Sequence, residues 1–209
     1  MGGDSITIDV TIVVENAYQG KAEYLLKQIG IAISKSGKTV VAKTNITEDF
    51  KTKQKFSINY NVNIPADRSL DISNKYGNLT INKLEANGKF NIAYGNITAQ
   101  TMKAPFGATI LLNLSYSKAD LQTINNMNAT IQYSKLFMGE TDKLQLESKY
   151  LTISIDKINQ LNAISKYDGF SIDKIGSLEA ESKYTHYNID KLEKKFVLNS
   201  EYGNIDVDE

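Results

Sequence analysis

Two series of charged residues recur in the sequence beside a repeated tyrosine. A lysine directly precedes this tyrosine in four repeats, and an aspartate or asparagine follows it by six positions in five repeats. The first series is Lys75, Lys149, Lys166 and Lys183, and the second is Asn82, Asp156, Asp173, Asp190 and Asp208. A row of lysines can bind an anionic polymer, but it is also typical of a solvated face on which the lysine stems cover a sheet.

The aspartate series suggests calcium, because Ca²⁺ prefers carboxylate oxygens. The glycine-rich nonapeptide of calcium-binding β-rolls is absent, however, and amide residues replace aspartate in the early repeats. Aspartates at chain corners also accept backbone N–H bonds without any metal. We therefore expect neither a metal nor another cofactor.

Two phenylalanines occupy unusual positions. Phe106 lies in the insertion KAPFGA of the longest repeat, and Phe137 stands where other repeats carry threonine, serine, asparagine or aspartate. Exposed apolar side chains of this kind indicate contact with a partner. The predicted binding surface therefore consists of Phe106, Phe137, Lys149, Lys166 and Lys183.

The side chains that most catalytic sites require are scarce. The chain has no cysteine, one histidine (His186) and one arginine (Arg68), so thiolate nucleophiles and most zinc sites have no residues to be built from. A lone histidine without an identified partner gives weak support for acid–base chemistry. We expect a protein that is not an enzyme. The alternative is a carbohydrate-active enzyme, a polysaccharide lyase or glycosidase with an acidic groove.

The overall charge excludes a strong electrostatic attraction to nucleic acid. Lys+Arg and Asp+Glu each number 24, which gives a formal net charge of zero. A balanced chain has no global field that would direct it to an anionic polymer, and we expect no nucleic-acid partner. We also expect no transmembrane span, because no apolar run approaches the roughly 18 residues that a spanning helix needs.

The repeat itself predicts the fold. The repeated tyrosines are Tyr76, Tyr94, Tyr116, Tyr133, Tyr150, Tyr167, Tyr184 and Tyr202, separated by 18, 22, 17, 17, 17, 17 and 18 residues. Within a repeat, apolar residues stand three, five and eight positions after the tyrosine and four and six before it. Spacing by two is typical of strands with one buried face, and a short fixed period is typical of stacked coils. We predict an all-β, right-handed parallel β-helix (a β-solenoid) with coils of about 17 residues.

The direction of the tyrosines remains open between two interpretations. They continue the inward alternation of the two preceding positions, which favours an internal aromatic ladder at a corner. In that case Ser148, Ser165, Ser182 and Ser200 would be their small neighbours. Tyrosines that faced outward would instead form a stacking platform for sugars.

The first 65 residues do not carry the repeat. Ser5–Asn16 alternates as a strand, Lys21–Ile29 can form a short amphipathic helix, the following segment reads as a hairpin turning at Ser36-Gly37, and another strand ends at Pro65. We predict residues 1–65 as a mixed strand and helix cap and residues 66–209 as the solenoid. Asp206, Asp208 and Glu209 would discourage edge-to-edge pairing at the other end.

Several stretches resemble a bacterial family. AEYLLKQIGIAISKSGKTVVAKTNI, then FSINYNVNIPADRSLDISNKYGNLTINKL, and the YGN units at Tyr76, Tyr94 and Tyr202 are similar to the adhesin-like proteins of unknown function that include the auto-transporter adhesin head GIN domain proteins. The resemblance implies an exported β-helical protein of the Gram-negative envelope, with a removed signal or lipid-anchored lipoprotein sequence before Asp4. It implies no binding residues.

Together these observations predict an extracytoplasmic binding or structural protein, in the periplasm or at the outer-membrane surface. It would act as an adhesin that presents a rigid repetitive surface to a polysaccharide or to an envelope or host protein.

Overall fold

The computed structural model describes residues 5–15 and 18–208. Asp4, Asn16 and Glu209, which entered the predictions above, lie outside these residues. The chain divides between Pro65 and Ala66 into two compact units. That the first unit caps the second stays a prediction.

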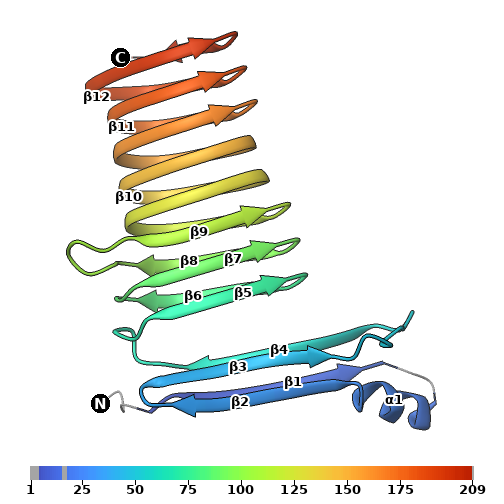
Figure 1. Ribbon diagram of the computed structural model, residues 1–209. Helices are drawn as coiled ribbons and strands as arrows, with labels where there is room; N and C mark the ends of the chain where they lie inside the picture. The colour runs from blue at the N-terminus through green and yellow to red at the C-terminus, as the bar shows by residue number, and fades with distance from the viewer. Residues whose placement is uncertain (1–4, 16–17, 209) are drawn as a thin grey trace. The chain divides into compact units, whose positions relative to one another are not determined.

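The first unit consists of a helix and two small antiparallel sheets (Figure 1). Strand β1 (Thr7–Val14) pairs with β4 (Phe56–Asn63), and β2 (Ile29–Ser36) pairs with β3 (Thr39–Ile46). Helix α1 is Gln19–Leu26. A strand, a helix and a hairpin are thus present as predicted, but the helix is Gln19–Leu26 rather than Lys21–Ile29, because Ile29 already begins β2. Gly37 makes the hairpin turn with a φ of 56°, a conformation that glycine adopts without steric cost.

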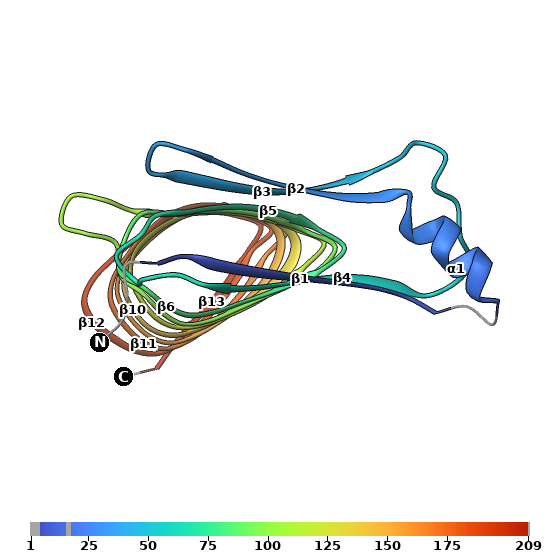
Figure 2. The same ribbon diagram turned by 90° about the horizontal axis from the view of Figure 1, so that it is seen from below.

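The second unit is a parallel β-solenoid of about eight turns, as predicted. Its first strands are β5 (Leu70–Lys75), β6 (Asn78–Leu84), β7 (Gly88–Ala93), β8 (Asn96–Met102) and β9 (Ile110–Ser115). The following strands are continuous through several corners: β10 (Lys118–Lys166), β11 (Gly169–Lys183), β12 (His186–Glu201) and β13 (Asn204–Val207). The front strands in Figure 1 run left to right as the chain rises and the return strands pass behind, which is a right-handed winding. Viewed from below in Figure 2, the coils superimpose as a flattened loop.

Each coil pairs in register with the next. Residues that pair between β10 and β11 are 17 apart in sequence, as in Ile155 with Ile172. In β11 and β12 the offset increases to 18 after Ile175, where the register shifts at a bulge. The insertion before β9 gives an offset of 22 between Phe90 and Leu112. The tyrosine spacings therefore record the register of the sheet.

The core is a continuous apolar column inside the solenoid. The residues three and five positions after the tyrosines are fully buried in the middle coils, for example Ile153, Ile155 and Ile172. At the final coil the equivalent residues Ile205 and Val207 are 42% exposed. A single coil cannot bury its own apolar face, so the repetition produces the core.

Of the two orientations left open for the tyrosines, the favoured inward one is wrong. All eight tyrosines are exposed, from 39% at Tyr167 to 74% at Tyr202. The reason is local backbone geometry, because each of these tyrosines has a φ between 50° and 65°. This left-handed conformation interrupts the in–out alternation of the strand and turns the side chain outward at the corner.

Beneath the tyrosines, polar side chains satisfy the backbone of the corner. Where the equivalent residue one coil later is serine, aspartate or threonine, the residue after the tyrosine donates its N–H to that side chain. Examples are Gly95 to Ser117 Oγ at 3.1 Å, Ser117 to Ser134 Oγ at 3.1 Å and Leu151 to Asp168 Oδ1 at 2.7 Å. Because the corner N–H groups have no strand partner, these bonds remove the cost of burying them.

Candidate functional site

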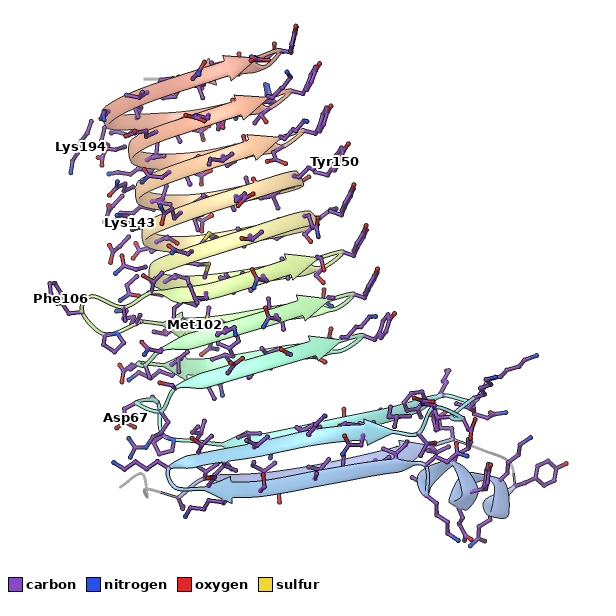
Figure 3. All side chains as sticks on the ribbon, in the orientation of Figure 1. Asp67, Met102, Phe106, Lys143, Tyr150 and Lys194 are labelled. Carbon is purple, nitrogen blue, oxygen red and sulfur yellow. The ribbon has the colours of Figure 1, made fainter. Side chains whose placement is uncertain are left out.

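The tyrosines form one continuous stack along the edge of the solenoid. Successive ring centroids lie 4.8–5.2 Å apart, with interplanar angles of 2–22°. We call this row, from Tyr76 to Tyr202, the tyrosine ladder. Figure 3 shows Tyr150 pointing away from its coil. Within the ladder each ring is covered by a neighbour on both faces, so a ligand meets ring edges and hydroxyl groups rather than open ring faces.

The predicted lysines lie against this ladder. Lys149 Nζ is 5.2 Å from the ring centroid of Tyr150, and Lys166 Nζ is 5.5 Å from that of Tyr167. Lys183 Nζ is 5.8 Å and 5.6 Å from the centroids of Tyr184 and Tyr202. These are cation–π distances, and they hold the ammonium groups beside the phenol rings.

An open groove runs along the sheet face next to the ladder, in the later coils. Its volume is about 570 Å³. Its outward side chains stand one and three positions before the tyrosines. They are Thr130, Gln132, Glu147, Lys149, Ile164, Lys166, Glu181, Lys183, Asn199 and Glu201. The three predicted lysines are therefore brought together in one groove.

A second groove, of about 370 Å³, continues the same face over the earlier coils. Thr130 and Gln132 line both grooves and so connect them. The side chains of the second groove are mostly uncharged, and its asparagines form a ladder of their own. Asn113 Nδ2 donates to Asn91 Oδ1 at 2.7 Å. The face is thus neutral and amide-rich near β5 to β9 and charged along β10 to β12.

Charges in the later groove are only partly paired. Lys183 Nζ lies 2.7 Å from Glu201 Oε2, and this contact raises the pKa of Lys183 and lowers that of Glu201. Both side chains remain in contact with solvent, so the pair adds little to stability. Within the described residues, Glu147, Glu181, Lys149 and Lys166 have no ion pair within 4.0 Å. These four groups remain free to bind a ligand.

The two predicted phenylalanines do not join this face. Phe106 is fully exposed on the loop between β8 and β9, at the edge opposite Tyr150 (Figure 3). The base of that loop is fixed by Asn125, which accepts from Ala104 N at 2.9 Å and donates to Ala104 O at 2.7 Å. Phe137 lies on the sheet that follows the tyrosines, 37% exposed, with Lys118 Nζ 4.8 Å from its ring centroid. The five predicted residues therefore occupy three separate places.

One carboxyl group in the solenoid is buried at the corner below the ladder. Burial raises the pKa of Asp168, although Ser148 Oγ, Leu151 N and Lys166 N all donate hydrogen bonds to it. The nearby Tyr187 hydroxyl is 3.1 Å from Ser165 Oγ, and burial raises its pKa too. Asp168 is buried within the corner and accepts hydrogen bonds from it. This carboxyl group therefore supports the fold and does not face the groove.

The aspartate series lies on the outside of the other sheet. No group of three or more histidine, cysteine or acidic residues that could hold a metal ion occurs among residues 5–15 and 18–208. His186 Nε2 lies 3.7 Å from Asp206 Oδ2 at the surface, with both side chains largely exposed.

The sequence reasoning missed the glutamates, the amides and the connecting residues of the face. Glu147 and Glu181 were not part of the predicted binding surface. A comparison of the residues three positions before each tyrosine would have placed four of them in one row beside the lysines: Asn91, Asn113, Glu147 and Glu181. Asp168 was also missed, although the position after the tyrosine carries glycine, serine, aspartate or threonine in seven of eight coils.

The fold and this face define the protein as a β-solenoid repeat protein with a polar, grooved face beside a tyrosine ladder. Comparison with protein-family models gives no match, and comparisons with curated proteins and with solved structures give none either. The described residues contain no helix with the length and apolarity that crossing a membrane requires.

Proposed function

We propose that the protein is an extracytoplasmic, adhesin-like binding protein that holds an extended polysaccharide along the tyrosine-edged face. It acts without chemical change to the ligand. The observation that carries this proposal is the continuity of the face: two connected grooves run beside eight stacked tyrosines. An extended polymer is the ligand that such a long, repetitive surface fits.

The side chains of the face suit a ligand rich in hydroxyl groups. Tyrosine hydroxyls, the amides of Asn91 and Asn113, and the carboxylates of Glu147 and Glu181 offer both donors and acceptors. The face is built on paired strands of a solenoid, so little side-chain and backbone order has to be gained on binding. Equivalent weak contacts on successive coils then add through multivalency.

The resemblance to the adhesin-like envelope proteins supports export and a binding role. The same resemblance suits an envelope or host protein as the partner, and Phe106 is the side chain that such a partner would contact first. We favour the polysaccharide because the grooved face is long and polar, whereas Phe106 is a single exposed side chain on a loop at the opposite edge.

A carbohydrate-active enzyme is the alternative. It would need two carboxyl groups converging on one sugar, with at least one pKa shifted toward the working pH. In the groove, contact with Lys183 lowers the pKa of Glu201, which is the direction opposite to that of a general acid. The raised pKa belongs to Asp168, which the corner encloses.

The test is retention of the purified chain on a panel of neutral and acidic polysaccharides, with the supernatant assayed for new reducing or unsaturated ends. Thr130→Trp places a bulky side chain where the two grooves connect. Thr152→Trp is the matched control, because Thr152 is also exposed on β10 but follows its tyrosine and lies on the other sheet. We expect retention without product, lost in Thr130→Trp and kept in Thr152→Trp. Product formation would favour the enzyme, and retention of no polysaccharide would refute the proposal.

A further inference from the structure

Like charges face one another on adjacent coils beside the tyrosine ladder. Lys166 and Lys183 are register partners on β10 and β11. Lys149 stands one repeat earlier, beside Tyr150, whose ring stacks on that of Tyr167 at 5.0 Å. Neighbouring strands are about 4.8 Å apart, and like charges placed directly opposite each other destabilise a sheet. Three successive lysines therefore cost stability unless something offsets their charge.

Among the described residues, one of these three lysines has an acidic partner. Glu201 lies 2.7 Å from Lys183 and neutralises it. Lys149 and Lys166 have cation–π contacts with tyrosine rings but no acidic partner within 4.0 Å in the described part of the chain. Two like charges therefore lie on adjacent coils without an acidic partner. Sites at which a protein accepts such a cost in stability are often functional.

We propose that Lys149 and Lys166 bind the anionic substituents of an acidic polysaccharide, one bearing carboxylate or sulfate groups. The inference rests on the proposed function and names the class of its ligand. The two ammonium groups and the adjacent phenol hydroxyls of Tyr150 and Tyr167 are all able to donate hydrogen bonds to an anion. Repeated anions along the polymer match repeated donors along the solenoid.

The glutamates of the groove orient this ligand. Glu147 and Glu181 stand two positions before Lys149 and Lys183 on their strands, which places them about 7 Å farther from the ladder. The groove therefore has a cationic stripe at the tyrosine edge and a partly acidic stripe behind it. Anionic substituents bind at the edge, and the ring hydroxyls of the sugar face Glu147 and Glu181. An evenly basic surface would not make this distinction.

The experiment compares charged polymers with uncharged polymers of the same backbone. One pair is polygalacturonate and its methyl ester, and the other is dextran sulfate and dextran. The variant is Lys149→Gln with Lys166→Gln. The matched control is Lys143→Gln with Lys194→Gln, which removes the same charge from exposed lysines at the edge opposite Tyr150 (Figure 3). Circular dichroism confirms the fold of each variant, and a single-stranded oligonucleotide is a further probe.

We expect the native chain to bind at least one charged polymer more tightly than its uncharged partner. The groove variant should lose about tenfold or more in affinity, and the control less than about threefold. Preference for polygalacturonate indicates carboxylate as the substituent, and preference for dextran sulfate indicates sulfate. Equal binding of charged and uncharged partners, or equal losses in both variants, would overturn the inference while leaving the proposed function intact. Stronger binding of the oligonucleotide with the same lysine dependence would also overturn it. Binding of no polysaccharide would refute the proposed function itself.

Discussion

Tyr150 and Tyr167 are 17 residues apart in the sequence, and their ring centroids are 5.0 Å apart in the fold, with an interplanar angle of 6°. Each residue has a positive φ, 54° and 59°. A bulky residue in this conformation costs about 1–2 kcal/mol, and stacked aromatic pairs return about 0.5–1.5 kcal/mol each. The stack therefore offsets the strain of the corner, and the two features explain why tyrosine recurs there.

The corner predicts an unusual order of stability for substitutions at Tyr150. Tyr150→Ala loses both stacking contacts and keeps the left-handed strain, so we expect a loss of about 1–3 kcal/mol in the free energy of unfolding. Tyr150→Gly loses the same contacts but relieves the strain, so it should be more stable than the alanine variant by about 1 kcal/mol. Urea denaturation measures both. An alanine variant that is more stable than the glycine variant would contradict the left-handed corner.

Asp168 predicts a specific pH dependence of stability. Its pKa is raised by burial in the folded state, so the folded chain holds the proton more tightly than the unfolded chain. The stability that it contributes is fully present below the unfolded value of about 4 and is lost as the pH rises through the raised folded pKa. Asp168→Thr copies Thr185, which occupies the equivalent position one coil later. Relative to this variant, the native chain should gain stability as the pH falls from 7 toward 4. Parallel curves of unfolding free energy against pH would refute this assignment.

Thr141 offers a stabilising substitution. Its side chain is buried in a core position where other coils carry leucine, methionine or isoleucine, and its Oγ1 has no hydrogen-bond partner in the described structure. Thr141→Val keeps the shape and removes the unpaired hydroxyl, so we expect a gain of about 1 kcal/mol. Thr185→Val is the contrasting control, because Thr185 Oγ1 bonds with Ser165 and with the carbonyl oxygen of Lys183. Thermal unfolding should shift upward for the first and downward for the second, and a shift in the same direction for both would count against the assignment.

Two glycines of one region test how closely the coils approach. A Cβ at Gly176 would lie 2.4 Å from the carbonyl oxygen of Asn159 on the neighbouring coil, whereas a Cβ at Gly169 would meet nothing within 4 Å. We expect Gly176→Ala to cost about 2 kcal/mol or more, because backbone must move, and Gly169→Ala to change stability by less than about 0.5 kcal/mol. Chemical denaturation of the pair measures the difference. Similar stabilities would mean that the coils do not approach as described.

The solenoid could be predicted from the sequence because its apolar residues repeat in a constant frame. Ile153, Ile155 and Ile158 are buried as that frame requires. The direction of the tyrosines could not, because strand alternation predicts side-chain direction only while the backbone stays extended, and the left-handed corner at Tyr150 reverses it. Similarly, the period grouped the three lysines Lys149, Lys166 and Lys183. The groove also depends on the positions of Glu147 and Thr130, which carry different residue types in different coils. Phe106 and Phe137 share a residue type but no surface, since a loop and a strand on different sides of the coil carry them.

The most direct test of the proposed binding face is oxidative footprinting of tyrosine side chains with and without the polysaccharide that the chain retains best. Tyr150 and Tyr167 lie beside the groove, whereas Tyr24 is 62% exposed in the first unit. Our account predicts that the polysaccharide lowers the oxidation rate of Tyr150 and Tyr167 several-fold and leaves Tyr24 unchanged. Protection of Tyr24 with unchanged oxidation of the ladder would place the ligand elsewhere and contradict it.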